Sequence, residues 1–103
     1  MNFEERVWKL MESIPKGKVT TYGLIAKKLN TRAYRAVGNA CRSNPYAPRV
    51  PCHRVVRSDG SVGGFGGETS GKTVEEKIRM LRGEGVDINN GKITDFDKAL
   101  FRF

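Results

Sequence analysis

Two short helical segments joined by a tight turn constrain the fold more than any other part of this chain. The first covers residues 22–29, and we expect Leu24, Ile25 and Leu29 to face inward. Asn30-Thr31 forms the turn, and the second segment runs from about Ala33 to Ser43 with small residues interleaved among arginines. A second helix that is small and basic on one face is typical of a helix-turn-helix motif.

A helix is predicted before this pair and another after it. Asn2 can cap a helix that runs to about Ser13, with apolar residues at helical spacing and a break at residues 15–18. The second runs from Thr73 to about Arg82, with one apolar face and an exposed face, and ends at Gly83. The apolar residues are Phe3, Val7, Leu10, Met11 and Ile14 in the first helix and Val74, Ile78 and Leu81 in the second, and the exposed ones are Glu75, Glu76, Lys77 and Arg79.

The sequence pattern predicts little regular structure for the rest of the chain. Val55-Val56 can begin a strand, Ser58-Asp59-Gly60-Ser61 is a turn, and we expect a small hairpin around residues 55–65. At 103 residues the chain has room for one core and not for two. We therefore predict a mainly α fold, a winged helix-turn-helix-like domain of four to five helices with a small β-hairpin, as a single domain over residues 1–103.

The charge of the chain is unevenly distributed. Residues 13–58 contain no Asp or Glu but ten Lys or Arg residues, within a net charge of +8. A basic segment without counter-charges attracts a polyanion, and nucleic acid is the leading candidate. The alternative is a basic surface that is merely well solvated.

One pentapeptide, Pro51-Cys52-His53-Arg54-Val55, holds the only histidine beside one of two cysteines. A thiol near an imidazole can be an activated nucleophile, because a lowered pKa raises the thiolate fraction. The pair can also be half of a metal site or a coincidence. Zinc is disfavoured, because Cys41, Cys52 and His53 lack the C-x-x-C spacing and have no obvious fourth ligand. If the pair is catalytic, His53 needs a partner that orients it, and a carboxylate such as Glu84 is of the right type.

No stretch is long and apolar enough to cross a bilayer, and the start of the chain lacks the profile of a signal peptide. We therefore expect a cytoplasmic protein. We also expect it to be a monomer that holds no metal. Both cysteines are expected to be thiols.

The pentapeptide resembles the active-site signature of the O6-alkylguanine-DNA alkyltransferases, the methylated-DNA–protein-cysteine methyltransferases. The order and spacing of further motifs hold from about Phe3 to Val86, so the resemblance covers the C-terminal catalytic and DNA-binding domain of that family but not its usual N-terminal domain. These further motifs are Thr21-Tyr22-Gly23, Arg35-Ala36-Val37-Gly38, Arg42-Ser43-Asn44-Pro45, Val62-Gly63-Gly64-Phe65-Gly66-Gly67 and Leu81-Arg82-Gly83-Glu84-Gly85.

The resemblance implies a catalytic role for five residues. Cys52 would be the thiolate that accepts the alkyl group from O6 of guanine. His53 would act as a base through a water molecule, with Glu84 orienting the imidazole. Tyr22 would protonate the departing guanine, and Asn44 would brace the turn that carries Cys52. Transfer would be irreversible and stoichiometric, and it would need no cofactor.

The resemblance also implies a substrate pocket and a DNA-binding surface on double-stranded DNA that contains O6-alkylguanine. Backbone groups of Cys52, Val55 and Gly66, with the ring of Phe65, would bind the base. Arg35 would fill the space of the extruded nucleotide, because O6 is out of reach within stacked DNA. The other expected DNA contacts come from Thr21, Tyr34, Ala36, Gly38 and Arg42. Close helix packing is the alternative for Ala36 and Gly38.

Three features depart from the pattern of the family. The family's N-terminal domain has no counterpart here. Phe65 stands where many relatives carry a tyrosine, and Gly66 stands where some carry a serine. Tyr34 replaces a small residue. A second function is therefore open. Short alkyltransferase-like proteins bind alkylated guanine without transferring the group and mark it for other repair proteins, but they carry another residue in place of Cys52. A plain helix-turn-helix regulator is a third reading.

Overall fold

The computed structural model describes residues 1–63 and 72–103. In this part of the chain five α-helices, one 3₁₀ turn and four short strands follow one another. They are α1 (Phe3–Glu12), β1 (Thr20–Thr21), α2 (Tyr22–Lys28), α3 (Tyr34–Arg42), η1 (Cys52–Arg54), β2 (Val55–Val56), α4 (Lys72–Gly83), β3 (Ile88–Asn89), β4 (Lys92–Ile93) and α5 (Phe96–Ala99). The prediction of a mainly α fold with a small hairpin is confirmed.

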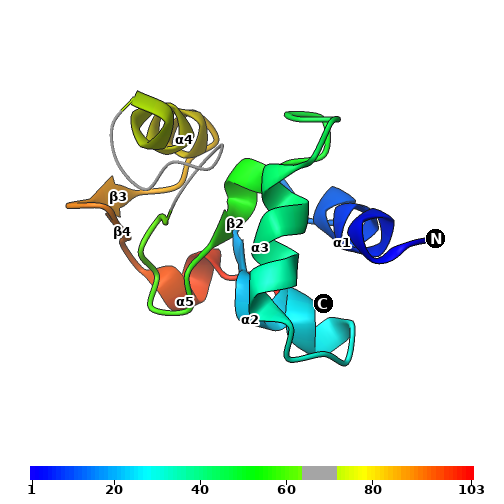
Figure 1. Ribbon diagram of the computed structural model, residues 1–103. Coiled ribbons are helices and arrows are strands. Elements are labelled where there is room, and N and C mark those ends of the chain that lie inside the picture. Colours follow the sequence, from blue (N-terminus) through cyan, green and yellow to red (C-terminus); the bar gives the residue numbers. More distant parts are fainter. Residues whose placement is uncertain (64–71) are drawn as a thin grey trace.

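The helices form two groups on either side of the β1–β2 pair (Figure 1). Helices α1, α2 and α3 pack together on one side, whereas α4 and the β3–β4 hairpin lie on the other. Each group has its own cluster of buried apolar residues, the first around Val7, Met11 and Ile25 and the second around Leu81 and Val56.

Helix α1 begins as the sequence predicts. The side chain of Asn2 accepts a hydrogen bond from the Glu5 amide at 2.8 Å, and the Glu5 carboxylate accepts one from the Asn2 amide at 3.1 Å. This reciprocal capping box satisfies two amide groups that a helix start leaves unpaired. Trp8 then donates from Nε1 to the carbonyl oxygen of Ala40 at 2.8 Å, which ties α1 to α3.

The turn between α2 and α3 is held by its own hydrogen bonds. Asn30 has a φ of 58°, in the left-handed region that asparagine tolerates better than most residues. The amide of Thr31 donates to the carbonyl oxygen of Ala26 at 3.0 Å, and the Thr31 hydroxyl accepts from the Ala33 amide at 3.1 Å. The predicted pair of helices and its tight turn are thus both present.

The expected hairpin around residues 55–65 does not form in its described part, residues 55–63, and residues 64 and 65 lie outside the described residues. Strand β2 pairs in parallel with β1, with Thr20 opposite Val55 and Thr21 opposite Val56. The antiparallel hairpin is instead formed by β3 and β4. Residues 57–61 do form the expected turn, in which Gly60 has a φ of 86° and packs closely on Phe96. A parallel partner more than thirty residues away leaves no local turn signal, so a sequence pattern cannot show it.

The C-terminal segment closes the fold onto β1. The Val19 amide donates to the carbonyl oxygen of Ala99 at 3.0 Å, and the Phe101 amide donates to that of Val19 at 2.7 Å. The Thr20 hydroxyl donates to the carbonyl oxygen of Phe101 at 3.0 Å. The rings of Phe101 and Phe103 pack on the first core cluster.

Candidate active site

Cys52 lies at the start of the η1 turn, at the end of an irregular segment that begins at Asn44. The Asn44 side chain donates from Nδ2 to the carbonyl oxygen of Val50 at 2.7 Å and accepts from the Tyr46 amide at 2.9 Å. The Cys52 amide donates to the same Val50 carbonyl at 2.9 Å. Asn44 therefore braces the segment two residues before the thiol, and Cys52 itself stays half-buried.

His53 and Glu84 meet although they are thirty-one residues apart. His53 Nε2 lies 3.0 Å from Glu84 Oε2, and the His53 side chain is almost completely buried. Glu84 follows the end of α4, so the packing of α4 against η1 brings the pair together.

Arg54 holds the Glu84 carboxylate from the other side. Its Nε donates to Oε1 at 2.9 Å and its Nη2 to Oε2 at 2.7 Å, while Nη1 donates to the carbonyl oxygen of Ile14 at 2.8 Å. A bidentate arginine fixes the plane of a carboxylate as well as its charge. This role of Arg54 is not predicted from the sequence, because no local pattern relates Arg54 to Glu84.

The environment sets the charge of both members of the pair. Burial lowers the pKa of His53 below its usual 6.5, although the hydrogen bond and charge of Glu84 act in the opposite direction. Burial alone would raise the pKa of Glu84, but hydrogen bonds from Arg54 and His53 outweigh it and the pKa falls. At neutral pH the pair is thus an imidazole and a carboxylate. Since a carboxylate only accepts hydrogen bonds, His53 donates from Nε2 and keeps Nδ1 as a proton acceptor.

Lys77 was expected on the exposed face of α4, and this is wrong. Its side chain is completely buried, and Nζ donates to the carbonyl oxygen of Val55 at 2.8 Å. Burial lowers the pKa of Lys77 to about 8, while the charges of Cys41 and Cys52 act to raise it. Its position in the helix could have indicated this burial, because Lys77 lies one helical turn before the buried Leu81 and so on the same face.

Tyr22 and Cys41 also lie within electrostatic reach of Cys52. Burial raises the pKa of Tyr22, and negative charge on Cys41 or Cys52 would raise it further. The hydroxyl of Tyr22 therefore keeps its proton at neutral pH. Burial likewise raises the pKa of Cys41 to about 12, and its Sγ lies 3.7 Å from Met11 Sδ. Cys41 is thus a neutral thiol in the core.

The structure describes only some of the residues that are expected to bind the base. Val55 is buried, and its carbonyl oxygen accepts from Lys77, which leaves a second lone pair for a ligand. Phe65 and Gly66 lie outside the described residues, so their predicted contacts stay predictions.

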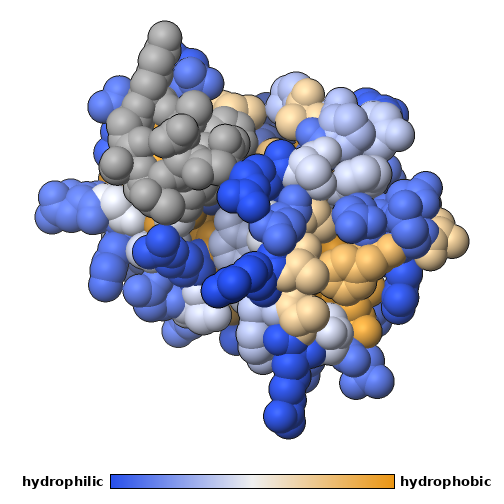
Figure 2. Space-filling model, viewed as in Figure 1, coloured by the Kyte–Doolittle hydropathy of each residue, from blue (hydrophilic) through white to orange (hydrophobic). Residues whose placement is uncertain are grey.

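The expected DNA-contacting residues lie mainly on α3. Arg35, Arg42 and Tyr34 are exposed, and hydrophilic side chains cross the middle of the face that contains α3 (Figure 2). A Cβ placed on Gly38 would have no neighbouring atom within 4 Å. Gly38 is therefore not needed for close helix packing against the described residues, which favours approach from outside the molecule. Ala36 is half-buried.

Thr21 is placed differently from the other expected DNA contacts. Its side chain is buried, and its hydroxyl accepts a hydrogen bond from the Leu24 amide at 3.0 Å, which caps α2. This is a structural role that the sequence analysis did not assign. A DNA contact from Thr21 stays a prediction.

Among residues 1–63 and 72–103, no three His, Cys, Asp or Glu side chains gather as a metal site would require. None of the helices in these two ranges has the length and apolar character needed to span a membrane.

Comparison with known proteins places similar sequences in one family. The model of the family described as "6-O-methylguanine DNA methyltransferase, DNA binding domain" matches residues 2–86. A methylated-DNA–protein-cysteine methyltransferase of Methanosarcina mazei is 47% identical over 80 residues, which cover 77% of this chain and 49% of that protein. The chain spans about half or less of the length of the curated relatives that it matches.

Solved structures show the same similarity. Mycobacterium tuberculosis OGT in complex with DNA is 40% identical with a TM-score of 0.73, over 82% of this chain and 50% of that one. Schizosaccharomyces pombe Atl1, in complex with damaged DNA containing O6-carboxymethylguanine, is 27% identical with a TM-score of 0.83, over 98% of this chain and 95% of that one. From the matched family model and these identities, this chain belongs to the family of the 6-O-methylguanine DNA methyltransferase DNA-binding domain.

Proposed function

We propose that the protein repairs DNA directly, by moving the alkyl group from O6 of an alkylated guanine to the sulfur of Cys52. The observation that carries this proposal is the buried His53–Glu84 pair, with Nε2 and Oε2 3.0 Å apart, adjoining a half-buried Cys52 on one turn. This is the arrangement of a nucleophile, a base and a group that orients the base.

The reaction is a single displacement. A water molecule carries the Cys52 proton to Nδ1 of His53, and the thiolate attacks the alkyl carbon. The carbon–oxygen bond breaks, its electron pair stays on guanine, and Tyr22 gives the proton that makes the base neutral. Because burial raises the pKa of Tyr22, the hydroxyl gives up this proton only when negative charge develops on the leaving guanine.

The product at Cys52 is a thioether. No group in the proposed site can restore the thiol, so one protein molecule removes one alkyl group. The reaction needs no cofactor.

Double-stranded DNA is the proposed partner, bound through α3. Arg35 enters the base stack in place of the extruded nucleotide, and Tyr34, Ala36, Gly38 and Arg42 approach the minor groove and the phosphates. The basic segment of residues 13–58, which contains no acidic residue, supplies an affinity that does not depend on sequence.

A second candidate function is a sensor that binds the damaged base without removing the alkyl group. The observation that favours it is the similarity to Atl1, with a TM-score of 0.83 over 98% of this chain, against 0.73 over 82% of it for the OGT structure. Cys52 is the observation against it, since the sensors carry another residue at the position of the nucleophile.

The decisive experiment is intact-mass measurement after incubation with a duplex that contains O6-methylguanine. We expect a stoichiometric gain of one methyl group, about 14 Da, on Cys52 and no gain in Cys52→Ala. Preferential binding of the damaged duplex without any gain in mass would favour the sensor. Equal affinity for damaged and undamaged duplex, with no adduct, would leave a helix-turn-helix regulator.

A further inference from the structure

Arg57 has no role in the site described above, yet the strand pairing places it beside Tyr22. Tyr22 directly follows β1 and Arg57 directly follows β2, and the two strands pair in parallel up to the residues before them. The two segments stay together one residue further, because a Cβ placed on Gly23 would lie 3.4 Å from Ser58 Oγ. The register of β1 and β2 therefore makes Tyr22 and Arg57 neighbours.

The turn after β2 holds Arg57 in place. Its amide donates to the carbonyl oxygen of Ser61 at 3.0 Å, and its carbonyl oxygen accepts from the Gly60 amide at 3.0 Å. Its side chain runs along Gly63, since a Cβ placed there would lie 3.4 Å from Arg57 Cγ and 3.5 Å from Nε. The residue is exposed, but both its backbone and the base of its side chain are fixed.

No ion pair neutralises Arg57 within residues 1–63 and 72–103, where the ion pairs join other residues. The neighbouring carboxylate of Asp59 turns to Ser61 instead, and accepts from its amide at 2.9 Å and from its hydroxyl at 2.7 Å. The guanidinium group of Arg57 is therefore available to act on Tyr22.

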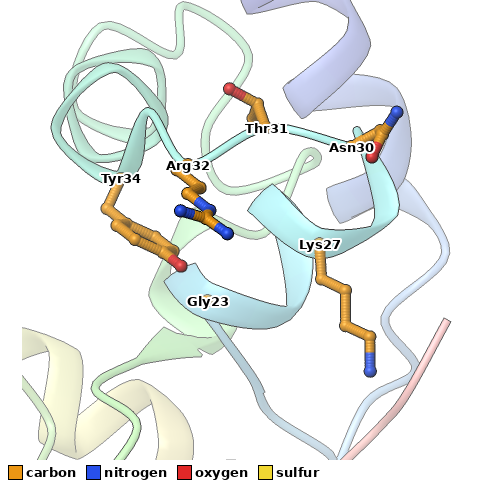
Figure 3. Close-up of a pocket in the computed structure, with 6 residues that line it drawn as sticks. All are labelled: Gly23, Lys27, Asn30, Thr31, Arg32 and Tyr34. Carbon is orange, nitrogen blue, oxygen red and sulfur yellow. The ribbon is translucent and has the colours of Figure 1, made fainter.

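Tyr22 lies among charges of both signs. Burial has the largest effect and raises its pKa, the charges of Cys41 on α3 and Cys52 on η1 raise it further, and the charge of Arg57 acts to lower it. Figure 3 shows Lys27, a cation on the same helix as Tyr22, projecting away from the start of that helix. The charge of Lys27 is not among those that shift the pKa of Tyr22.

We propose that Arg57 is a positioning residue for alkyl transfer, which acts through Tyr22 by stabilising the phenolate that forms when Tyr22 gives its proton to the departing guanine. The inference rests on the proposed function. In this step the O–H bond of Tyr22 breaks, its electron pair stays on the oxygen and the proton goes to guanine, while Arg57 keeps its charge and transfers nothing. A cation stabilises the phenolate more than the neutral phenol, so the interaction strengthens as the reaction proceeds.

Single-turnover transfer from free O6-benzylguanine tests this role without DNA, whose phosphates attract any exposed arginine. We expect Arg57→Gln to lower the maximal rate by roughly fivefold to tenfold, a modest loss because water and salt screen an exposed charge. The half-saturating concentration of the free base should not change. Arg57→Lys should retain most of the rate, because it keeps the charge.

Arg79→Gln is the matched control. Arg79 is an equally exposed arginine, it lies on α4, and its charge is not among those that shift the pKa of Tyr22. We expect this variant to react at the wild-type rate. A loss equal to that of Arg57→Gln would show only an effect of net charge and would overturn the proposal.

The dependence on Tyr22 is tested by repeating Arg57→Gln in a Tyr22→Phe background. Because no phenolate forms there, the loss should shrink to less than about twofold. An equal loss with and without the Tyr22 hydroxyl would overturn the proposal. A loss that Arg57→Lys does not restore, accompanied by a lower free energy of unfolding, would also overturn it, because Arg57 would then only support the turn.

Failure of the proposed function has a different signature. If the wild-type protein forms no adduct on Cys52 with O6-benzylguanine or with a damaged duplex, the proposed function is wrong and this inference is wrong with it. If the wild type reacts and Arg57→Gln reacts equally fast, only the inference is wrong.

Discussion

The surroundings of His53 control its charge. Its side chain is almost completely buried, and the first effect of this burial is to lower its pKa. Glu84 acts in the opposite direction through a hydrogen bond and its charge. The neutral imidazole therefore persists to a pH below 6.5, and Glu84 sets how far below.

Replacing Glu84 by Gln should change the pH dependence of alkyl transfer. Without the carboxylate charge, the pKa of His53 falls further, so the acidic limb of the rate profile should move to lower pH. Because the imidazole also becomes a weaker base with a less fixed orientation, we expect the maximal rate to fall by about 100-fold. Single-turnover rates with free O6-benzylguanine between pH 4.5 and 8 measure both effects.

Glu75→Gln is the control, because Glu75 is an exposed carboxylate on α4, the helix that Glu84 follows. An acidic limb that moves to higher pH in Glu84→Gln would contradict the assigned role of the carboxylate.

A second prediction concerns the effect of Lys77 on the free energy of unfolding. Its pKa is about 8 in the folded chain, against an ordinary value of 10.5. Between these two pH values the unfolded chain binds a proton that the folded chain does not, so the lysine makes the fold more stable as pH rises. The free energy of unfolding of the wild type should therefore increase relative to Lys77→Met by on the order of 3 kcal/mol across this range.

Chemical denaturation at several pH values measures this difference. The exposed Lys9→Met serves as a control that should show no such trend. If the difference in free energy of unfolding between wild type and Lys77→Met does not vary with pH, the pKa of Lys77 is not lowered in the folded chain.

At the scale of elements, α3 connects the active site to the proposed DNA surface. Its buried residues Val37, Ala40 and Cys41 pack into the core, whereas Arg35 and Arg42 are exposed near its two ends. The backbone of Ala40 also accepts the hydrogen bond from Trp8, which holds α3 against α1. The helix is thus fixed in place, and its outer face is free to meet DNA.

Arg35→Ala should impair repair of a duplex more than reaction with a free base. Only the duplex requires a nucleotide to leave the stack, which costs a few kcal/mol. We expect the rate ratio of wild type to variant to be at least about tenfold larger on duplex O6-methylguanine than on O6-benzylguanine. Arg42→Ala, at the other end of α3, should mainly weaken DNA affinity. Equal losses of Arg35→Ala on both substrates would exclude a role in base extrusion.

At the scale of the whole molecule, the C-terminal segment joins the two halves of the fold. Ala99 and Phe101 pair with Val19, next to β1, while the ring of Phe101 packs on the first core cluster. The family model matches only residues 2–86, so this closure lies beyond the matched part.

Phe101→Ala should therefore lower the free energy of unfolding by about 2–3 kcal/mol, because a large and partly buried ring is removed from the core. Arg102→Ala is the matched control, since Arg102 is exposed and should change stability by less than about 0.5 kcal/mol. Thermal unfolding of the two variants makes the comparison. Equal stability of both would indicate that the segment does not contribute to the core.

Local sequence determined the helices, the turn between α2 and α3, and the position of Cys52. Each depends on neighbouring residues: Asn2 caps α1, apolar spacing selects the buried face, and Asn30 permits the turn. The order of the family motifs along the chain also pointed to Tyr22, Asn44 and Glu84 as candidate site residues.

Only the tertiary structure decided which distant groups meet. The parallel pairing of β1 with β2, the hold of Arg54 on Glu84 and the burial of Lys77 all join segments more than twenty residues apart. A charged residue in a helix is normally taken as exposed, whereas Lys77 is buried with its Nζ donating to the carbonyl oxygen of Val55. The sequence alone thus places the thiol and the imidazole, whereas the packing of α4 against η1 brings Glu84 to His53 and buries Lys77 beside Val55.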